Sequence, residues 1–219
     1  AAGFMAQGVA RVTGKAAVCM ATSGPGAMNL LTAVADARSD SIPLVAITGQ
    51  VNTNLIGTDA FQEADTFGLS FPITKHSVMV KSAKELLTAV PLAFAIAESG
   101  RPGPVLIDVP RNVQTELCEV PSDFDSSFKR IYDEYASHAV RNKTKDEDVP
   151  NVLENIVESL KKAKNPILYV GGGANSSEAS EKICEFLKIY DIPVISSLMG
   201  LGVVPRSSPT FLGMVGMHG

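Results

Sequence analysis

The stretch AAVCMATSGPGAMNLLTAVADA, residues 16–37, decides the fold. An apolar run ends at Thr22, the letters SGPG interrupt it, and apolar residues then recur at helical spacing. A continuous apolar run is typical of a strand buried on both faces of a parallel sheet. Pro25 suits the first turn of the following helix, because the N–H that proline lacks would be unpaired there. The stretch therefore predicts a strand, a rigid turn and a helix.

The same alternation continues on both sides of this stretch. A helix should end near Gly14, and the sequence Ser82 to Glu85 is a capping box that opens a further helix, with a kink or break at Pro91. The other elements that we expect are strands over 42–49, 74–80 and 101–110, a loop over 50–59 and a short helix within 60–70. Strands that alternate with helices predict a doubly wound parallel α/β sheet.

Residues 119–150 differ in composition from what precedes them, being polar and poor in aliphatic residues. We interpret them as a partly ordered linker between a first domain, 1–118, and a second α/β domain, 151–219. In the second domain we expect helices over 151–163 and 176–190 and strands over 166–170 and 193–197. Both ends of the chain lack capping signals, so we interpret it as an internal fragment whose second domain is incomplete.

The overall composition excludes several classes of protein. Among 219 residues, 45% are hydrophobic and 19% charged, and the net charge of −4 comes without a basic cluster, which argues against nucleic-acid binding. No apolar run is long enough to span a membrane. Three widely spaced cysteines (Cys19, Cys118 and Cys184) form no disulfide framework and no metal-binding spacing, which indicates a reducing compartment such as the cytoplasm.

Two segments of the first domain could bind a ligand. The SGPG turn should lie at the carboxyl edge of the sheet, where open α/β sheets bind ligands, but a bare turn is equally compatible with the spacing. In GTDAFQE, residues 57–63, Phe61 and Gln62 offer an aromatic face and an amide for a small polar substrate. Local pattern alone favours a plain helix start there, with Asp59 as its N-cap.

Two further segments could bind anionic groups. Arg101 lies between glycine and proline in SGRPGP, where it could bind a phosphate or carboxylate or simply be solvated. The sequence YVGGG, residues 169–173, could cradle a diphosphate on the N–H groups of a helix that follows. Three glycines without the GxGxxG spacing are weak evidence for such a site.

Taken together and in order, several segments resemble one family: GFMAQGVARVTGK, ATSGPGAMNLLTAVADA, IPLVAITGQV, IGTDAFQEAD, SGRPGPVLIDVP, KNPILYVGGG, SSLMGLG and LGMVGMHG. The chain resembles the catalytic subunits of acetolactate synthases (acetohydroxyacid synthases), which use thiamine diphosphate and also bind FAD. The resemblance implies a pyrimidine-binding domain followed by the start of an FAD-binding domain. It also implies that the catalytic glutamate and the Mg²⁺-diphosphate site lie outside these residues, so that the chain alone would be inactive.

The resemblance also implies roles for particular residues. The SGPG turn would hold the aminopyrimidine ring of the cofactor through Thr22, Gly24, Pro25 and Asn29. Phe61 and Gln62 would be the catalytic residues, facing the reacting carbon from the neighbouring subunit's side. FAD would contact Arg101, Gly171, Gly172, Gly173, Ser197, Leu198, Met217, His218 and Gly219. Asn52 and Arg111 differ from the usual family residues and would border the channel in which inhibitors of this family bind.

The implied reaction joins two 2-keto acids, pyruvate with pyruvate or with 2-ketobutyrate, and releases carbon dioxide, as in branched-chain amino-acid biosynthesis. The implied partners are further copies of the same chain, in a dimer or tetramer, and a regulatory subunit. A eukaryotic source would imply a plastid or mitochondrial location instead of the cytoplasm. Other thiamine-diphosphate enzymes, such as pyruvate oxidase or glyoxylate carboligase, and a non-catalytic nucleotide-binding module remain alternatives.

Overall fold

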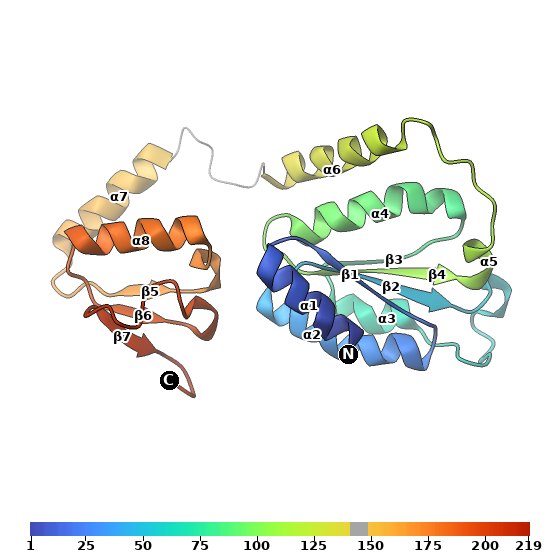
Figure 1. The fold of residues 1–219 in the computed structure, drawn as a ribbon, viewed down its shortest axis with the longest axis horizontal. Helices are drawn as coiled ribbons and strands as arrows, with labels where there is room; N and C mark the ends of the chain where they lie inside the picture. The colour runs from blue at the N-terminus through green and yellow to red at the C-terminus, as the bar shows by residue number, and fades with distance from the viewer. Residues whose placement is uncertain (141–148) are drawn as a thin grey trace. The chain divides into compact units, whose positions relative to one another are not determined.

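The computed structural model describes residues 1–140 and 149–219, so residues 141–148 of the expected linker lie outside the described part of the chain. The chain divides into two compact units, Ala1–Thr144 and Lys145–Gly219. Each unit is a parallel α/β sheet with helices packed on it (Figure 1).

The sheet of the first unit has the order β1-β2-β4-β3, and all its strand pairs are parallel. Its strands are β1 (Ala17–Ala21), β2 (Leu44–Gln50), β3 (His76–Met79) and β4 (Pro104–Pro110). The two central strands, β2 and β4, are almost completely buried, as the apolar runs predict. Because every strand points the same way, all their carboxyl ends lie along one edge of the sheet.

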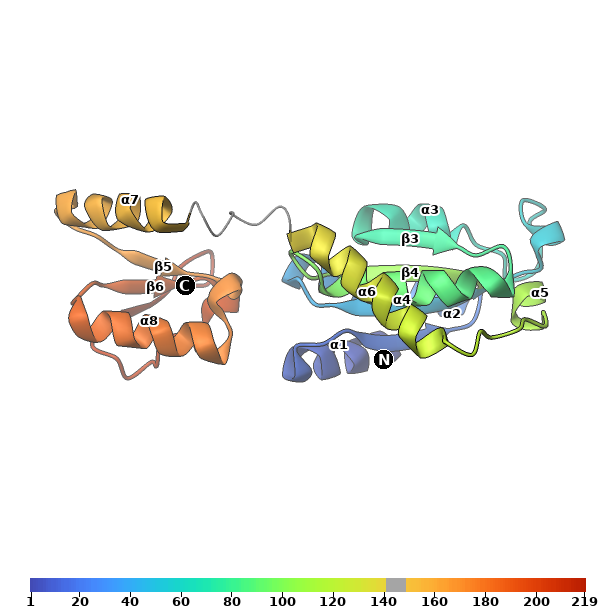
Figure 2. The same ribbon diagram turned by 90° about the horizontal axis from the view of Figure 1, so that it is seen from above.

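Helices cover both faces of this sheet, which confirms the doubly wound arrangement (Figure 2). On one face α1 (Ala2–Thr13) and α2 (Pro25–Asp40) bury Ala10, Leu30 and Val34 with Leu44 and Leu106 of the strands. On the other face α4 (Ala83–Glu98) packs through alanines and Ile96. The shorter helices are α3 (Thr66–Ser70) and α5 (Arg111–Gln114), with 3-10 turns η1 (Thr53–Leu55) and η2 (Phe71–Ile73).

The helix boundaries follow the capping chemistry of the sequence. Helix α1 ends at Gly14 in the left-handed conformation. The Ser82 hydroxyl accepts a hydrogen bond from the Glu85 N–H at 3.3 Å and begins α4 as expected. The helix does not break at Pro91 but runs uninterrupted to Glu98, with Pro91 buried. Packing of this face on the sheet therefore outweighs the hydrogen bond that the proline removes.

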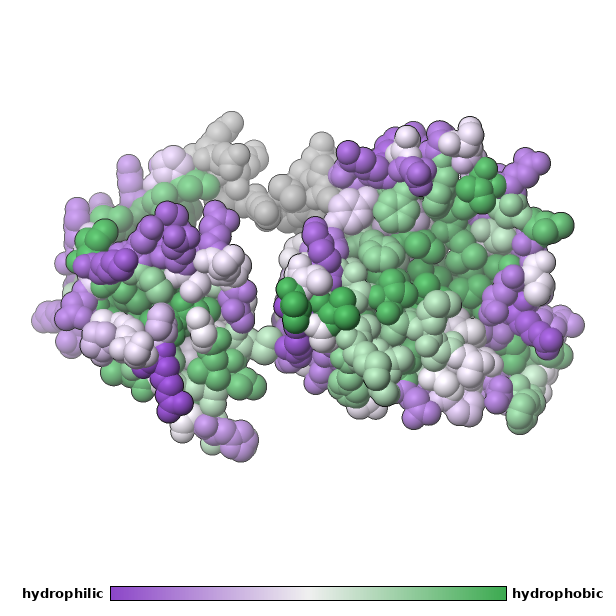
Figure 3. All heavy atoms as spheres, viewed as in Figure 1, coloured by the Kyte–Doolittle hydropathy of each residue, from purple (hydrophilic) through white to green (hydrophobic). Residues whose placement is uncertain are grey.

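One expectation about the first unit is wrong. Strand β1 is not buried on both faces: it is an edge strand, and the side chains of Val18 and Met20 are 44% and 67% exposed. Figure 3 shows hydrophobic residues on the side of the first unit that faces the viewer. The expected linker, residues 119–150, contains a helix that the sequence did not indicate: α6 (Phe124–Val140) packs along α4 and places the ring of Phe128 6.4 Å from that of Phe94.

The second unit has a three-stranded parallel sheet of order β5-β6-β7. Its elements are α7 (Val149–Lys162), β5 (Leu168–Val170), α8 (Ser177–Ile189), β6 (Val194–Ser196) and β7 (Phe211–Met214), with 3-10 turns η3 (Gly172–Ala174) and η4 (Leu198–Gly200). Its small core is built from Val170, Val194, Val203 and Val204. The strand β7 was not expected from its glycine-rich sequence. Within the described residues, no helix has the length and apolar character needed to cross a bilayer.

Candidate functional site

The turn after β1 is held open in a conformation that requires glycine. Gly24 has φ 58° and ψ −118°, a region that side chains with a Cβ rarely adopt. A Cβ atom at Gly24 would lie 2.7 Å from the carbonyl oxygen of Gln62 and 2.9 Å from its Cα. The backbone of the SGPG turn therefore packs directly against the backbone of the GTDAFQE segment, so the two segments that we singled out in the sequence meet in space.

The surface around this turn is accessible. Gly24 itself is buried, but Thr22, Pro25 and Asn29 are exposed. Gly24 is the N-cap of α2 and provides no side-chain cap, and Pro25 occupies the first turn as expected. The Asn29 amide donates a hydrogen bond to the Pro25 carbonyl at 2.8 Å, which stiffens this turn. The unpaired N–H groups of an exposed, rigid helix start of this kind can bind polar or negatively charged groups.

The segment over 57–63 is a strained loop, not a helix start. Asp59 and Gln62 both have positive φ values, 56° and 60°, which are uncommon for residues other than glycine. Asp59 is therefore not an N-cap. That role belongs to Asp65, whose carboxylate accepts a hydrogen bond from the Gly68 N–H at 2.9 Å at the start of α3.

Glu63 closes this loop. Its carboxylate accepts hydrogen bonds from the backbone N–H groups of Gly57 and Ala60, the latter at 2.9 Å. These two bonds lower the pKa of Glu63, because they stabilise its charged form. The closed loop presents Phe61, which is 88% exposed, and Gln62 at the surface beside the Gly24 turn. Strained backbone that is held by several bonds is typical of functional loops.

A buried polar cluster lies behind the loop at the carboxyl ends of β2 and β4. The Thr48 hydroxyl donates to one oxygen of Asp108 at 2.7 Å, and the Gln50 amide donates to the other at 3.1 Å. The Gln50 amide also donates to the Ala64 carbonyl at 2.7 Å. Burial raises the pKa of Asp108 to about 6, and the bonds from Thr48 and Gln50 oppose this shift.

We did not single out this cluster in the sequence. Its signal was present, since Thr48, Gln50 and Asp108 are polar residues within or at the end of otherwise apolar strand runs. A buried polar residue in such a run is more informative than the apolar residues around it. Which of the three pair with one another depends on the sheet register, in which Thr48 lies beside Asp108.

Arg101 does not join the residues of the Gly24 turn. It precedes the amino end of β4, at the opposite edge of the sheet. Its guanidinium donates to the Ser41 hydroxyl at 2.7 Å and to the Ser39 carbonyl at 3.1 Å, and so satisfies the carboxyl end of α2. Arg101 is thus bonded within the first unit, and its contact with FAD stays a prediction.

The glycines after β5 do not open directly into a helix. Gly172 and Gly173 form the 3-10 turn η3, and α8 begins only at Ser177. The first turn of α8 is capped by Ser176, whose hydroxyl accepts a hydrogen bond from the Ala179 N–H at 3.2 Å. The expected cradle of helix N–H groups next to the glycines is therefore not formed.

The remaining candidates of the second unit gather at the carboxyl edge of its sheet. Ser197, at the end of β6, donates its N–H to the Val170 carbonyl at 2.9 Å and places Leu198 in η4, next to the glycine turn. Met217, His218 and Gly219 follow β7 at the same edge, and His218 lines a hollow there. The hydroxyl of the preceding Ser196 is buried and has no hydrogen-bond partner in the described part of the chain. An unpaired hydroxyl at this edge fits a polar ligand group.

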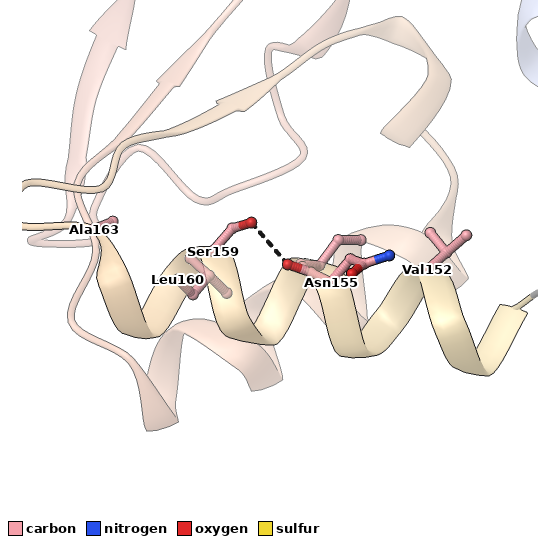
Figure 4. Close-up of a pocket in the computed structure, with 6 residues that line it drawn as sticks. Val152, Asn155, Ser159, Leu160 and Ala163 are labelled. Atoms are coloured by element: carbon pink, nitrogen blue, oxygen red, sulfur yellow. Dashed lines mark hydrogen bonds between the residues drawn. The ribbon is translucent and has the colours of Figure 1, made fainter.

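Two other features carry no site. Within residues 1–140 and 149–219, no group of three or more histidine, cysteine or acidic side chains could hold a metal ion. The hollow in Figure 4 runs along α7 and is lined by residues of that helix and by Ala163 directly after it, where the Ser159 hydroxyl donates to the Asn155 carbonyl at 2.7 Å. None of our candidate residues lies in it.

Each of the two units matches a known protein family. Residues 1–69 match the family described as thiamine pyrophosphate enzyme, N-terminal TPP binding domain, and residues 153–219 match thiamine pyrophosphate enzyme, central domain. The whole chain is 47% identical over 218 residues to the acetolactate synthase isozyme 1 large subunit of Escherichia coli (strain K12), and covers 36% of that protein.

Two more relatives are also acetolactate synthases and match nearly the whole of this chain. Over 221 residues the chain is 45% identical to the acetolactate synthase large subunit of Corynebacterium glutamicum, covering 100% of this chain and 33% of that protein. Over 218 residues it is 46% identical to acetolactate synthase 2, chloroplastic, of Nicotiana tabacum, covering 99% of this chain and 31% of that protein. The chain thus spans about a third of the length of these curated relatives.

Proposed function

Because the chain is homologous over its whole length to acetolactate synthase large subunits and matches two domains of thiamine pyrophosphate enzymes, we propose that it is part of an acetolactate synthase. The reaction condenses pyruvate with pyruvate or with 2-ketobutyrate and releases carbon dioxide, in branched-chain amino-acid biosynthesis. The observation that carries this proposal is the contact between Gly24 and Gln62, which brings a ring-binding turn and a substrate-facing loop together at one accessible edge.

The first unit would hold the aminopyrimidine ring of thiamine diphosphate on Thr22, Gly24, Pro25 and Asn29. When bound, this cofactor supplies a carbanion and a ring that takes up the electrons left by decarboxylation. Phe61 would cover the reacting centre and exclude water, which favours the loss of a carboxylate charge. Gln62 would orient the acceptor keto acid, because an amide can donate and accept hydrogen bonds without acting as an acid or base.

The second unit would bind FAD. Gly171, Gly172, Gly173, Ser197, Leu198 and the residues Met217, His218 and Gly219 would approach the nucleotide. A contact of Arg101 with FAD is a separate part of the proposal. The open side of Gly173 and the unpaired hydroxyl of Ser196 support this assignment. We assign residues 1–118 to the pyrimidine-binding domain, 119–150 to the linker and 151–219 to the central domain, and place the Mg²⁺ and diphosphate site outside the chain.

A homo-oligomer would complete the site, because the cofactor that the Gly24 turn, Phe61 and Gln62 would face is assigned in part to a neighbouring subunit. The outer face of α1 supports this, since Phe4, Met5, Val9 and Val12 are all exposed on it. The relatives from Escherichia coli and Corynebacterium glutamicum are named large subunits, which supports a regulatory small subunit as a further partner. We propose a cytoplasmic location, or a plastid one as in the relative from Nicotiana tabacum.

The test is an assay of the full-length protein with pyruvate, thiamine diphosphate, Mg²⁺ and FAD. We expect acetolactate as the product, and we expect Gln62→Ala to lower kcat by about tenfold to a hundredfold, because the acceptor loses its orienting amide. Asn54→Ala, which removes another amide from the 51–60 loop region, is the matched control and should leave kcat unchanged. Acetate or carbon dioxide without acetolactate would contradict the proposal, and unaltered kinetics of Gln62→Ala would remove this residue from the mechanism.

A further inference from the structure

The loop that presents Phe61 and Gln62 cannot hold its own shape. Asp59 and Gln62 have positive φ values, and both Phe61 and Gln62 project into solvent. Each such backbone position costs on the order of 1–3 kcal/mol and persists only where the surroundings fix it. The Glu63 carboxylate accepts hydrogen bonds from Gly57 and Ala60 within the loop, but these two bonds do not attach the loop to the sheet. Besides the packing of Gln62 against Gly24, the loop has a hydrogen-bonded attachment to the sheet.

The attachment runs through Gln50, the last residue of β2. Its amide nitrogen has two protons, and the structure uses one for the Ala64 carbonyl and the other for Asp108. Its amide oxygen accepts from the Val51 N–H at 2.8 Å. Because every polar group of this side chain is engaged and Gln50 is buried, the amide can adopt only one orientation. The Ala64 carbonyl, two residues after Gln62, is thereby fixed to the end of a central strand.

Asp108 in turn fixes Gln50. This carboxylate is fully buried in β4 and accepts from Thr48 with one oxygen and from Gln50 with the other. We propose that Gln50 and Asp108 are positioning residues, a buried amide–carboxylate pair that holds the Ala64 carbonyl and so places Phe61 and Gln62 beside the Gly24 turn. This inference rests on the function proposed above, in which Gln62 orients the acceptor keto acid.

The test exchanges the amide of Gln50 and the carboxylate of Asp108. In the double variant Q50E/D108N, the new amide at position 108 can donate to the new carboxylate at position 50, so the bond between the two positions remains. The hydroxyl of Thr48 and the N–H of Val51 also keep their acceptors. Only the Ala64 carbonyl loses its donor, since a carboxylate has no proton to give. The double variant therefore removes the attachment of the loop and keeps the other bonds of the cluster, although the second N–H of the new amide at position 108 gains no acceptor from the cluster.

The measurements are made on the full-length enzyme. We expect Q50E/D108N to keep a melting temperature near that of the wild type, to exchange the backbone N–H groups of residues 57–66 about tenfold faster or more, and to lose kcat by about tenfold or more with a smaller change in KM. The control S77A alters a separate buried hydroxyl cluster, in which Ser77 bonds to Ser70 and Thr74, and should leave kcat unchanged.

A wild-type kcat in Q50E/D108N, at a melting temperature near that of the wild type, would overturn the inference. Unaltered hydrogen exchange of the backbone N–H groups of residues 57–66 would overturn it as well. If the double variant does not fold, the single variant D108N decides. It keeps the side-chain volume but leaves one acceptor oxygen for the two donors Thr48 and Gln50. Wild-type hydrogen exchange over 57–66 and a wild-type kcat in D108N would overturn the inference. Hydrogen exchange needs no substrate, so it still tests the attachment of the loop if the wild-type enzyme makes no acetolactate and the proposed function fails.

Discussion

The two units place glycines at the same point of their folds, after the first strand of each sheet, but use them differently. In the first unit, Gly24 is followed at once by α2, and another loop packs on its backbone. In the second unit, Gly173 lies in a 3-10 turn, and α8 begins later behind its own serine cap. No atom of the described residues would come within 4 Å of a Cβ added at Gly173.

The difference shows what each glycine is needed for. Gly24 is required by the fold, because its backbone angles and its contact with Gln62 both exclude a side chain. Gly173 is not required by any packing contact or by a left-handed backbone. A glycine that the folded chain does not need is a candidate for contact with something outside it. The turn at Gly24 is thus shaped by contacts within the protein, whereas the turn at Gly173 leaves open space beside the glycine.

The largest effect is expected for Gly24→Ala. The added methyl group would enter unfavourable backbone space and overlap the backbone of Gln62, which we expect to lower the free energy of unfolding by about 4 kcal/mol. Urea unfolding of the protein measures this. Gly14→Ala is the matched control: it has a similar φ of 68° but open space for the Cβ, and should cost only about 1 kcal/mol. Equal losses in the two variants would show that the contact with Gln62 contributes nothing.

Most of the fold was predictable because local patterns are strong in this chain. The apolar runs located β2, β4, β5 and β6, and the Ser82 capping box located the start of α4. Local pattern failed where the outcome depended on distant partners. The burial of β1 could not be predicted, because a strand's position at the edge of a sheet is set by strand order and not by its own residues. Helix α6 was missed because its aromatic side chains are buried only by packing on α4, an element distant in sequence.

The candidate site was predictable as a list of residues but not as an arrangement. The letters SGPG and AFQE pointed to Gly24 and Gln62 separately, and only the fold shows that their backbones touch. The cluster of Thr48, Gln50 and Asp108 was missed, because its members are separated in sequence and meet through the register of β2 and β4. Arg101 shows the converse, since its local pattern suggested an anion site whereas its guanidinium bonds to the end of α2.

The next effect concerns pH and comes from a carboxyl group that is buried behind the turn of the first unit. The pKa of Asp108 is raised from 3.8 to about 6 by burial, with a further contribution from the charge of Asp65. The folded state therefore keeps this proton longer than the unfolded state. The free energy of unfolding should fall by about 3 kcal/mol as the pH rises from about 4 to about 6, and this loss remains at higher pH.

Unfolding titrations of D108N at several pH values test this expectation. The variant should lack that part of the pH dependence, because its amide does not ionise. The control D36N changes an exposed carboxyl group on α2 and should keep the wild-type slope. The polar side chain at the corresponding edge of the second sheet, Ser196, is a hydroxyl and contributes no slope in this range. A wild-type slope in D108N would mean that another group of the chain carries the dependence.

A smaller effect is expected for Gly200→Ala in the second unit. A Cβ at Gly200 in η4 would collide with the carbonyl of Val170, a closer approach than at any of the three glycines, of which the tightest is Gly172 at 3.0 Å from the Cβ of Met199. We expect the free energy of unfolding to fall by about 2 kcal/mol, because the buried backbone of η4 must move away from β5. Thermal unfolding followed by circular dichroism measures the loss. An unchanged melting temperature would show that η4 can shift freely, and the contrast with Gly24 would then extend to the whole unit.

The smallest effect on stability is expected for Gly173→Ala, and for that reason it is the most informative about function. The methyl group would meet no atom within 4 Å, so the melting temperature should change by about 1–2 K at most. If the space beside Gly173 is used by FAD, as we propose, the same methyl group should weaken flavin binding by about tenfold, measured by titration of the full-length apoenzyme. Gly8→Ala, on α1 and equally free of neighbours, is the control and should bind flavin as the wild type does. Unchanged flavin affinity in Gly173→Ala would mean that the space beside this glycine serves no ligand, and the assignment of the turn to FAD would fail with the fold intact.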